Sequence, residues 1–63
     1  MGRLEVTKCR KTPIGTKITV RANKKAVAYF DSLLGERVFT LKKGYQLTLT
    51  VKGWDWDKGD TLS

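Results

Sequence analysis

Hydrophobic and polar residues alternate with a period of two along most of the chain. Successive side chains of a strand point to opposite faces of a sheet, so this alternation predicts strands with one buried face. In residues 45–51, a Tyr, two Leu and a Val alternate with a Gln and two Thr. The expected strands cover residues 4–9, 17–21, 26–30, 37–41 and 45–51.

Proline and glycine mark the turns between these segments. Pro13 fixes φ at one central turn position, and Gly15 accepts the positive φ that a later position needs. Residues 42–44, Lys-Lys-Gly, predict a second tight connection. Residues 31–36 begin with Asp-Ser and include a glycine, which predicts a short loop or a single helical turn.

Short strands at intervals of eight to twelve residues are typical of an all-β sandwich or barrel. Closure into a small five- to six-stranded barrel removes exposed sheet edges, so we expect that architecture for residues 1–56. Residues 57–63 are expected to form a polar, flexible tail. The expected core comprises Leu4, Val6, Ile18, Val20, Val38, Leu47, Leu49 and Val51.

The composition argues against catalysis. A chain of 63 residues buries only about 60% of its extended surface, which leaves no room for a deep pocket. There is no His and only one Cys, Cys9, so triads that need His and mixed Cys/His zinc sites cannot form. The carboxylates at positions 55, 57 and 60 do not fit a calcium loop. We therefore expect a non-enzyme without cofactor or metal.

The sequence also predicts the compartment. A single unpaired Cys favours a reducing environment. The uncharged stretch that contains residues 45–51 is too short to span a membrane. The first five residues contain no apolar run that could serve as a signal segment. The expectation is a soluble cytoplasmic protein with no membrane partner.

The net positive charge comes from residues 1–52 and not from residues 53–63. Residues 1–52 contain 12 basic and 3 acidic side chains, whereas residues 53–63 contain 1 and 3. A field of this sign attracts polyanions, of which nucleic acid is the commonest inside cells. Lysines on turns and edge strands also keep sheets soluble, which is the alternative reading of the same residues. The candidate phosphate contacts are Lys17, Arg21, Lys24, Lys25, Lys42 and Lys43.

Aromatic residues provide a second indication of binding. Small β-barrels hold single-stranded nucleic acid by stacking bases on aromatic side chains beside basic groups. Trp54 is the candidate platform, whereas Phe39 and Tyr45 are expected in the core. Trp54 and Trp56 lie two residues apart and would share a strand face, so both would be buried or both exposed.

Residues 18–54 resemble the bacterial SH3-like family. The similarity lies in Thr-Val-Arg at 19–21, Gly35 before Arg-Val at 37–38, Leu-Lys-Lys-Gly at 41–44, and Gly-Trp at 53–54. The resemblance implies an SH3-like barrel that binds peptides, cell-wall glycopeptide or other proteins. The chain differs from the family at residues 22–25, where a Ser-Gly-Pro turn is usual, and in the acidic residues after Trp54.

These observations predict a non-catalytic module that binds nucleic acid through a basic face bearing aromatic residues. The alternative is an SH3-like protein- or peptide-interaction module that engages an acidic protein partner. The choice between DNA and RNA, the strandedness, the identity of a protein partner and formation of a homodimer stay open at this point.

Overall fold

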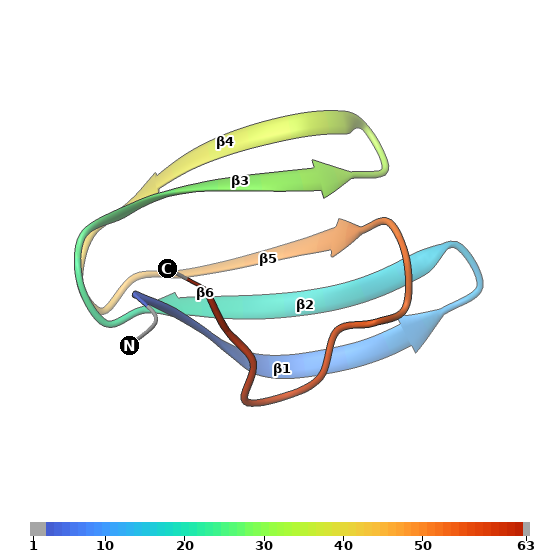
Figure 1. Ribbon diagram of the computed structural model, residues 1–63, viewed down its shortest axis with the longest axis horizontal. Coiled ribbons are helices and arrows are strands. Elements are labelled where there is room, and N and C mark those ends of the chain that lie inside the picture. Colours follow the sequence, from blue (N-terminus) through green and yellow to red (C-terminus); the bar gives the residue numbers. More distant parts are fainter. Residues whose placement is uncertain (1–2, 63) are drawn as a thin grey trace.

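The computed structural model describes residues 3–62, and all regular elements within that range are strands. Residues 1, 2 and 63 of the predicted domain and tail lie outside it. The strands form one sheet in the order β4-β3-β5-β2-β1-β6 (Figure 1). Their bounds are β1 Leu4–Thr12, β2 Gly15–Ala22, β3 Ala26–Ser32, β4 Gly35–Leu41, β5 Gln46–Val51 and β6 Thr61–Leu62. The all-β prediction is confirmed.

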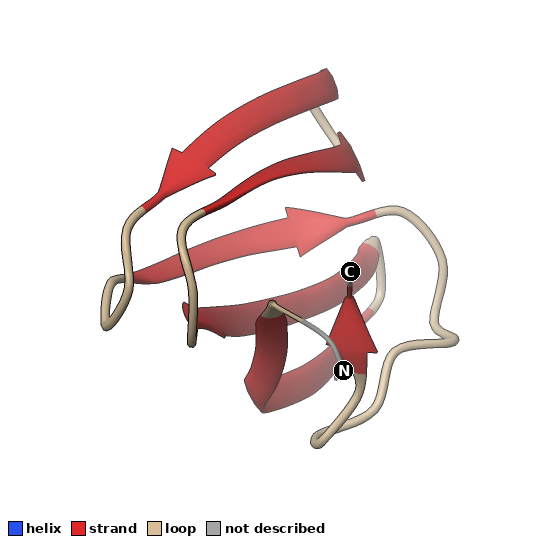
Figure 2. Cartoon of the chain, turned by 60° about the vertical axis from the view of Figure 1, so that its left-hand side comes forward, coloured by secondary structure: helices blue, strands red, loops and turns tan. Residues whose placement is uncertain are grey.

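The sheet curls around its core and remains open (Figure 2). Within the described residues, β4 and β6 are its two edges, and β3 joins β5 at the single pair Ser32 and Val51. The architecture is therefore a curled half-barrel. The same range contains no helix long and apolar enough to cross a membrane.

Most of the predicted core is confirmed. Leu4, Val6, Ile18, Val20 and Val51 are buried, and Leu47 and Leu49 are partly buried against them. Small and large side chains of the β3–β4 hairpin complete the interior: Ala26, Ala28, Phe30, Phe39 and Leu41.

The prediction for Val38 was wrong, because its side chain is 55% exposed. On β4, Phe39 and Leu41 share one face and Val38 lies on the other. Burying Phe39 and Leu41 removes more apolar surface from water than burying one valine. These two residues therefore determine which face of β4 points toward the core. Of the two alternatives expected for residues 31–36, the short loop is the one present: Leu33 and Leu34 make a tight turn between β3 and β4.

A bulge reverses the alternation within β1. Val6 pairs with Val20, but the next pair is Lys8 with Thr19, so Thr7 is the extra residue. Simple alternation would place Lys8 beside Leu4 and Val6 on the inner face. The bulge turns Lys8 outward and turns Cys9 inward, where Cys9 packs against the core.

Residues 52–60 have no regular structure, but side chains fix them to the sheet. The Thr16 hydroxyl donates to the Gly53 carbonyl at 2.7 Å, and the Cys9 thiol donates to the Trp56 carbonyl at 3.0 Å. The Trp56 ring packs on Phe30 with a centroid distance of 6.2 Å. Because this segment is not a strand, the prediction that Trp54 and Trp56 share burial was wrong: Trp54 is exposed and Trp56 half-buried.

The end of the chain returns to the sheet. Thr61–Leu62, within the segment expected to be a polar tail, form β6 and pair with Glu5 and Leu4 of β1. Leu62 packs against the core. Two residues, of which only Leu62 is apolar, were therefore sufficient to add a strand where the surrounding polar composition predicted none.

Candidate functional site

The outer face of β1, β2 and β5 is an array of polar side chains. Residues directly opposite each other in antiparallel strands share a face, so the register defines three rows across these strands. The rows are Glu5–Arg21–Gln46, Lys8–Thr19–Thr48 and Arg10–Lys17–Thr50. We call this surface the basic face. Its four cations are exposed, and Glu5 is its one acidic residue.

Three cations of the basic face form a cluster. Arg10 pairs directly with Lys17, and Lys8 is the diagonal neighbour of Lys17. Cβ atoms of direct partners lie about 5 Å apart and those of diagonal neighbours no more than about 8 Å, so the positive charges repel one another. Within residues 3–62 the one ion pair joins Lys52 to Asp31, so no carboxylate forms an ion pair with this cluster.

Three of the four remaining positions of the basic face are threonines, and the fourth is Gln46. The Thr19 and Thr48 hydroxyl oxygens are 2.9 Å apart and share a hydrogen bond, and the Thr7 hydroxyl donates to the Thr19 carbonyl at 3.3 Å. These hydrogen bonds hold the small threonine side chains in place on the basic face. Hydroxyl, ammonium and guanidinium groups are the groups that contact phosphate in nucleic-acid complexes.

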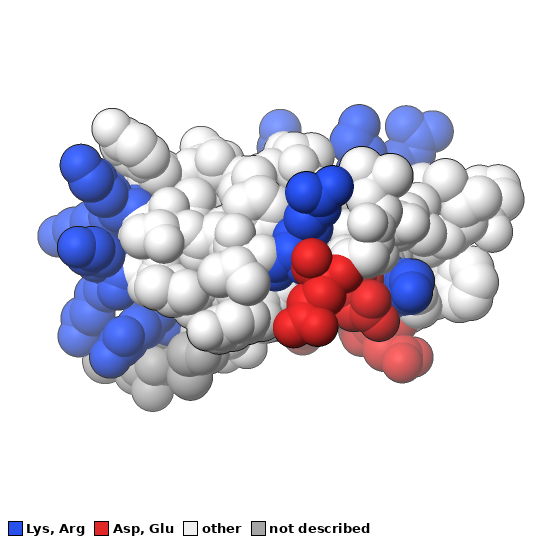
Figure 3. Space-filling model, turned by 90° about the horizontal axis from the view of Figure 1, so that it is seen from above, with Lys and Arg blue, Asp and Glu red and all other residues white. Residues whose placement is uncertain are grey.

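A second group of cations lies at one end of the sheet. Ala22 donates from its backbone N–H to the Tyr45 carbonyl, and Gly44 donates to the Ala22 carbonyl, which holds the β4–β5 connection against the end of β2. Asn23 donates to the Arg3 carbonyl, which brings in the start of the described chain. Lys and Arg side chains gather at this end, on the left in Figure 3. We call it the basic end: Arg3, Lys24, Lys25, Lys42 and Lys43.

The predicted site residues therefore separate into three places. Lys24, Lys25, Lys42 and Lys43 come together at the basic end. Arg21 is on the basic face next to that end, and Lys17 is farther along the same strand. Trp54 is beyond the opposite end of β1, where its indole N–H donates to the Thr12 carbonyl at 2.7 Å.

Two exposed aromatic side chains mark the two ends of β2. Tyr45 is 62% exposed and bonds to Ala22 at the basic end. Trp54 is 53% exposed and is attached to the opposite end through Thr12. None of the three rows of the basic face contains an aromatic residue.

Sequence reasoning missed three exposed residues, of which two lie on the basic face and one at the basic end. Lys8 and Arg10 were missed because the bulge in β1 turns them outward. The signal is the spacing of three between the inward residues Val6 and Cys9, which breaks the period of two. Tyr45 was expected in the core, but it precedes β5 and is exposed.

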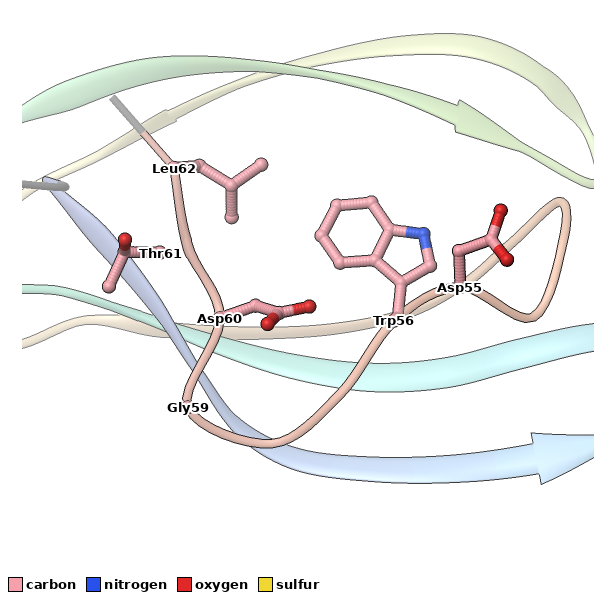
Figure 4. Close-up of a pocket in the computed structure, with 6 residues that line it drawn as sticks. All are labelled: Asp55, Trp56, Gly59, Asp60, Thr61 and Leu62. Atoms are coloured by element: carbon pink, nitrogen blue, oxygen red, sulfur yellow. The ribbon is translucent and has the colours of Figure 1, made fainter.

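Most acidic side chains lie outside the three strands of the basic face. A surface hollow of about 680 Å³ is lined by Asp55, Trp56, Gly59, Asp60, Thr61 and Leu62. In Figure 4 the Asp60 carboxylate points toward Trp56, whereas Asp55 lies on the other side of that ring. Within residues 3–62 no group of three or more Cys, Asp or Glu side chains could hold a metal ion.

Comparisons with family models, with curated proteins and with solved structures find no match to this chain. The SH3-like resemblance therefore stays a prediction.

Proposed function

We propose that this protein binds nucleic acid without catalysing a reaction, through the basic face and the adjoining basic end. The observation that carries the proposal is the cluster of Lys8, Arg10 and Lys17, which has no carboxylate partner within the described residues. Holding three cations together raises the free energy of the folded protein. A bound polyanion removes that cost and releases its own counterions.

The arrangement favours contacts to phosphate over contacts to bases. Lys, Arg and Thr side chains of the basic face position a backbone, and phosphate contacts carry no sequence information. A single strand that follows β2 would meet Tyr45 at one end and Trp54 at the other, where bases could stack. The proposal is therefore a binding mode with little sequence preference and a strong dependence on salt.

The non-catalytic part of the proposal rests on the chemistry of the side chains. The chain has no His, and its one Cys donates its thiol to a backbone carbonyl. We also propose that the fold is SH3-like, which the antiparallel strands of a curled sheet support. The proposal of an SH3-like fold concerns architecture only and assigns no residue to binding.

A heteronuclear NMR titration tests the proposal. Labelled protein is titrated with a single-stranded DNA of about 12 nucleotides, the matching RNA, the matching duplex and heparin. We expect the largest amide shifts at residues 8–10, 17–25, 42–45 and 54, with saturation by at least one nucleic acid. Saturation by heparin alone, or shifts confined to residues outside these ranges, would contradict it.

A further inference from the structure

Strand β4 is an edge of the sheet that has only one neighbouring strand within the described residues. It pairs with β3 over seven residues, Gly35–Leu41, without a register shift. Its other side has no pairing partner within the described residues. Natural edge strands are usually shortened, bulged, interrupted by proline or supplied with charged side chains, because a row of free N–H and C=O groups attracts another strand. β4 carries two charged side chains, Glu36 and Arg37, but it is seven residues long and has no bulge or proline, so its backbone can accept a further strand.

An apolar hollow adjoins the inner side of this edge. It has a volume of about 470 Å³, and its lining includes Leu33, Leu34, Arg37, Phe39 and Leu49. Arg37 and Phe39 pair with Phe30 and Ala28, so both belong to the inner face of the hairpin. Their burial differs, because Phe39 is half-buried and Arg37 is exposed at the mouth of the hollow.

Arg37 gives this hollow a charge preference. It is the one charged residue among those that line the hollow, and no carboxylate pairs with it within residues 3–62. A guanidinium at the rim of an apolar site prefers a carboxylate, which it can bind through two parallel hydrogen bonds. A ligand for this site therefore combines an apolar group with a carboxylate.

The hairpin turn that forms one wall is held in place. The Ser32 hydroxyl donates to the Gly35 carbonyl at 2.7 Å and accepts from the Leu34 N–H at 3.3 Å. Leu34 is 83% exposed, although its backbone is fixed by these bonds. A preformed apolar wall lowers the entropic cost of binding.

We propose that β4 binds an extended acidic peptide of a partner protein, which adds to the sheet as a seventh strand. In an antiparallel arrangement, an apolar residue of the peptide lies opposite Phe39, and an acidic residue two positions later lies opposite Arg37. The residue between them lies opposite Val38 on the outer face, where a β-branched side chain packs well. The recognised pattern is apolar, β-branched, acidic.

Charge favours such a peptide over a second copy of this chain. The protein carries a formal charge of +7, so two copies repel each other, whereas an acidic segment is attracted. Pairing two β4 strands about Val38 would place each Arg37 opposite the partner's Phe39 and supply no carboxylate. This site is separate from the basic face, so it adds a second binding activity to the proposed function.

The test uses a capped peptide with the sequence Ser-Thr-Leu-Val-Glu-Thr-Ser and its counterpart with Lys in place of Glu. In NMR titrations we expect the Glu peptide to shift amides of residues 33–41 and the Lys peptide to bind about tenfold more weakly or worse. Arg37→Glu should reverse this preference, so that the Lys peptide binds the variant better. Arg37→Gln, which removes the charge alone, should abolish the preference.

Controls make each outcome decisive. Lys58→Glu makes the same charge change in the loop that precedes β6 and should leave the preference for the Glu peptide unchanged. Dispersed spectra of the Arg37 variants show that they are folded. Absence of saturable binding, a preference that Arg37→Glu does not reverse, or shifts confined to residues that belong neither to β4 nor to the lining of the hollow would overturn the proposal. Concentration-dependent shifts of β4 without peptide would identify a second copy as the occupant and overturn it too.

Discussion

Arg10 and Lys17 are direct cross-strand partners on the outer face of β1 and β2. Like charges in this position destabilise an antiparallel pair. The opposite case occurs in the β3–β4 hairpin, where Asp31 pairs with Glu36. There Lys52 supplies a counter-ion, with its Nζ 3.5 Å from an Asp31 carboxylate oxygen. The acidic pair has a counter-ion within the described residues, whereas the basic pair has none there.

Replacing one member of the basic pair should therefore separate stability from binding. We expect Lys17→Thr to raise the free energy of unfolding by about 0.2 to 1 kcal/mol, because it removes the repulsion and retains a β-branched residue. The same change should weaken nucleic-acid binding. Urea denaturation and fluorescence anisotropy measure the two effects.

Lys58→Thr is the matched control, because Lys58 is an exposed lysine beside Asp57 in the loop before β6. It should neither stabilise the protein nor weaken binding. Equal losses of affinity in the two variants would show that total charge, and not the basic face, determines binding.

Two valines, one buried and one exposed, test which face of β4 points toward the core. Val20→Thr places a hydroxyl at a fully buried position and should cost about 1 to 3 kcal/mol. Val38→Thr makes the same change on the outer surface and should alter stability by less than about 0.5 kcal/mol. Thermal denaturation of both variants decides the matter, and equal losses would place Val38 in the core.

Sequence patterning was sufficient for β1 to β5 and most of the core, because alternation at Leu4, Val6, Ile18 and Val20 matches one face of the sheet. It failed where alternation allows two phases. On β4, Val38 competes with Phe39 and Leu41, and only packing against Ala26 and Ala28 selects between them.

The candidate site was harder to predict than the fold. Clustering of Lys42 and Lys43 with Lys24 and Lys25 depends on backbone bonds between Ala22 and residues 44–45, which no local pattern indicates. The irregular course of residues 52–60 depends on bonds from Cys9 and Thr16, which are distant in sequence. Long-range side-chain to backbone bonds of this kind leave no periodic signal.

Gly15 should be among the least replaceable glycines. Its φ is +158°, and a Cβ atom added there would lie 2.3 Å from the Val51 carbonyl oxygen. Gly44 also has a positive φ, +87°, but an added Cβ would meet nothing within 4 Å. Gly44→Ala should cost about 1 kcal/mol of backbone strain. Gly15→Ala should lower the melting temperature much further, and an equal effect of the two changes would contradict the close approach of β2 and β5.

The two tryptophans should have different roles. Trp54→Ala should weaken binding to a single strand by about 1 to 3 kcal/mol per stacked base, with a modest loss of stability from the Thr12 bond. Trp56→Ala should destabilise the protein, because its ring packs on Phe30. Denaturation and anisotropy on both variants distinguish these roles, and unchanged affinity of the Trp54 variant would exclude stacking there.

The salt dependence of nucleic-acid binding tests the central claim most directly. Four cations of the basic face predict a slope of log affinity against log salt of about −3 or steeper, at about 0.7 per phosphate contact with a single strand. Replacing Lys8, Arg10 and Lys17 together with Gln should make that slope shallower by about 2. A slope near zero for the parent protein, or the same slope for parent and triple variant, would contradict the account.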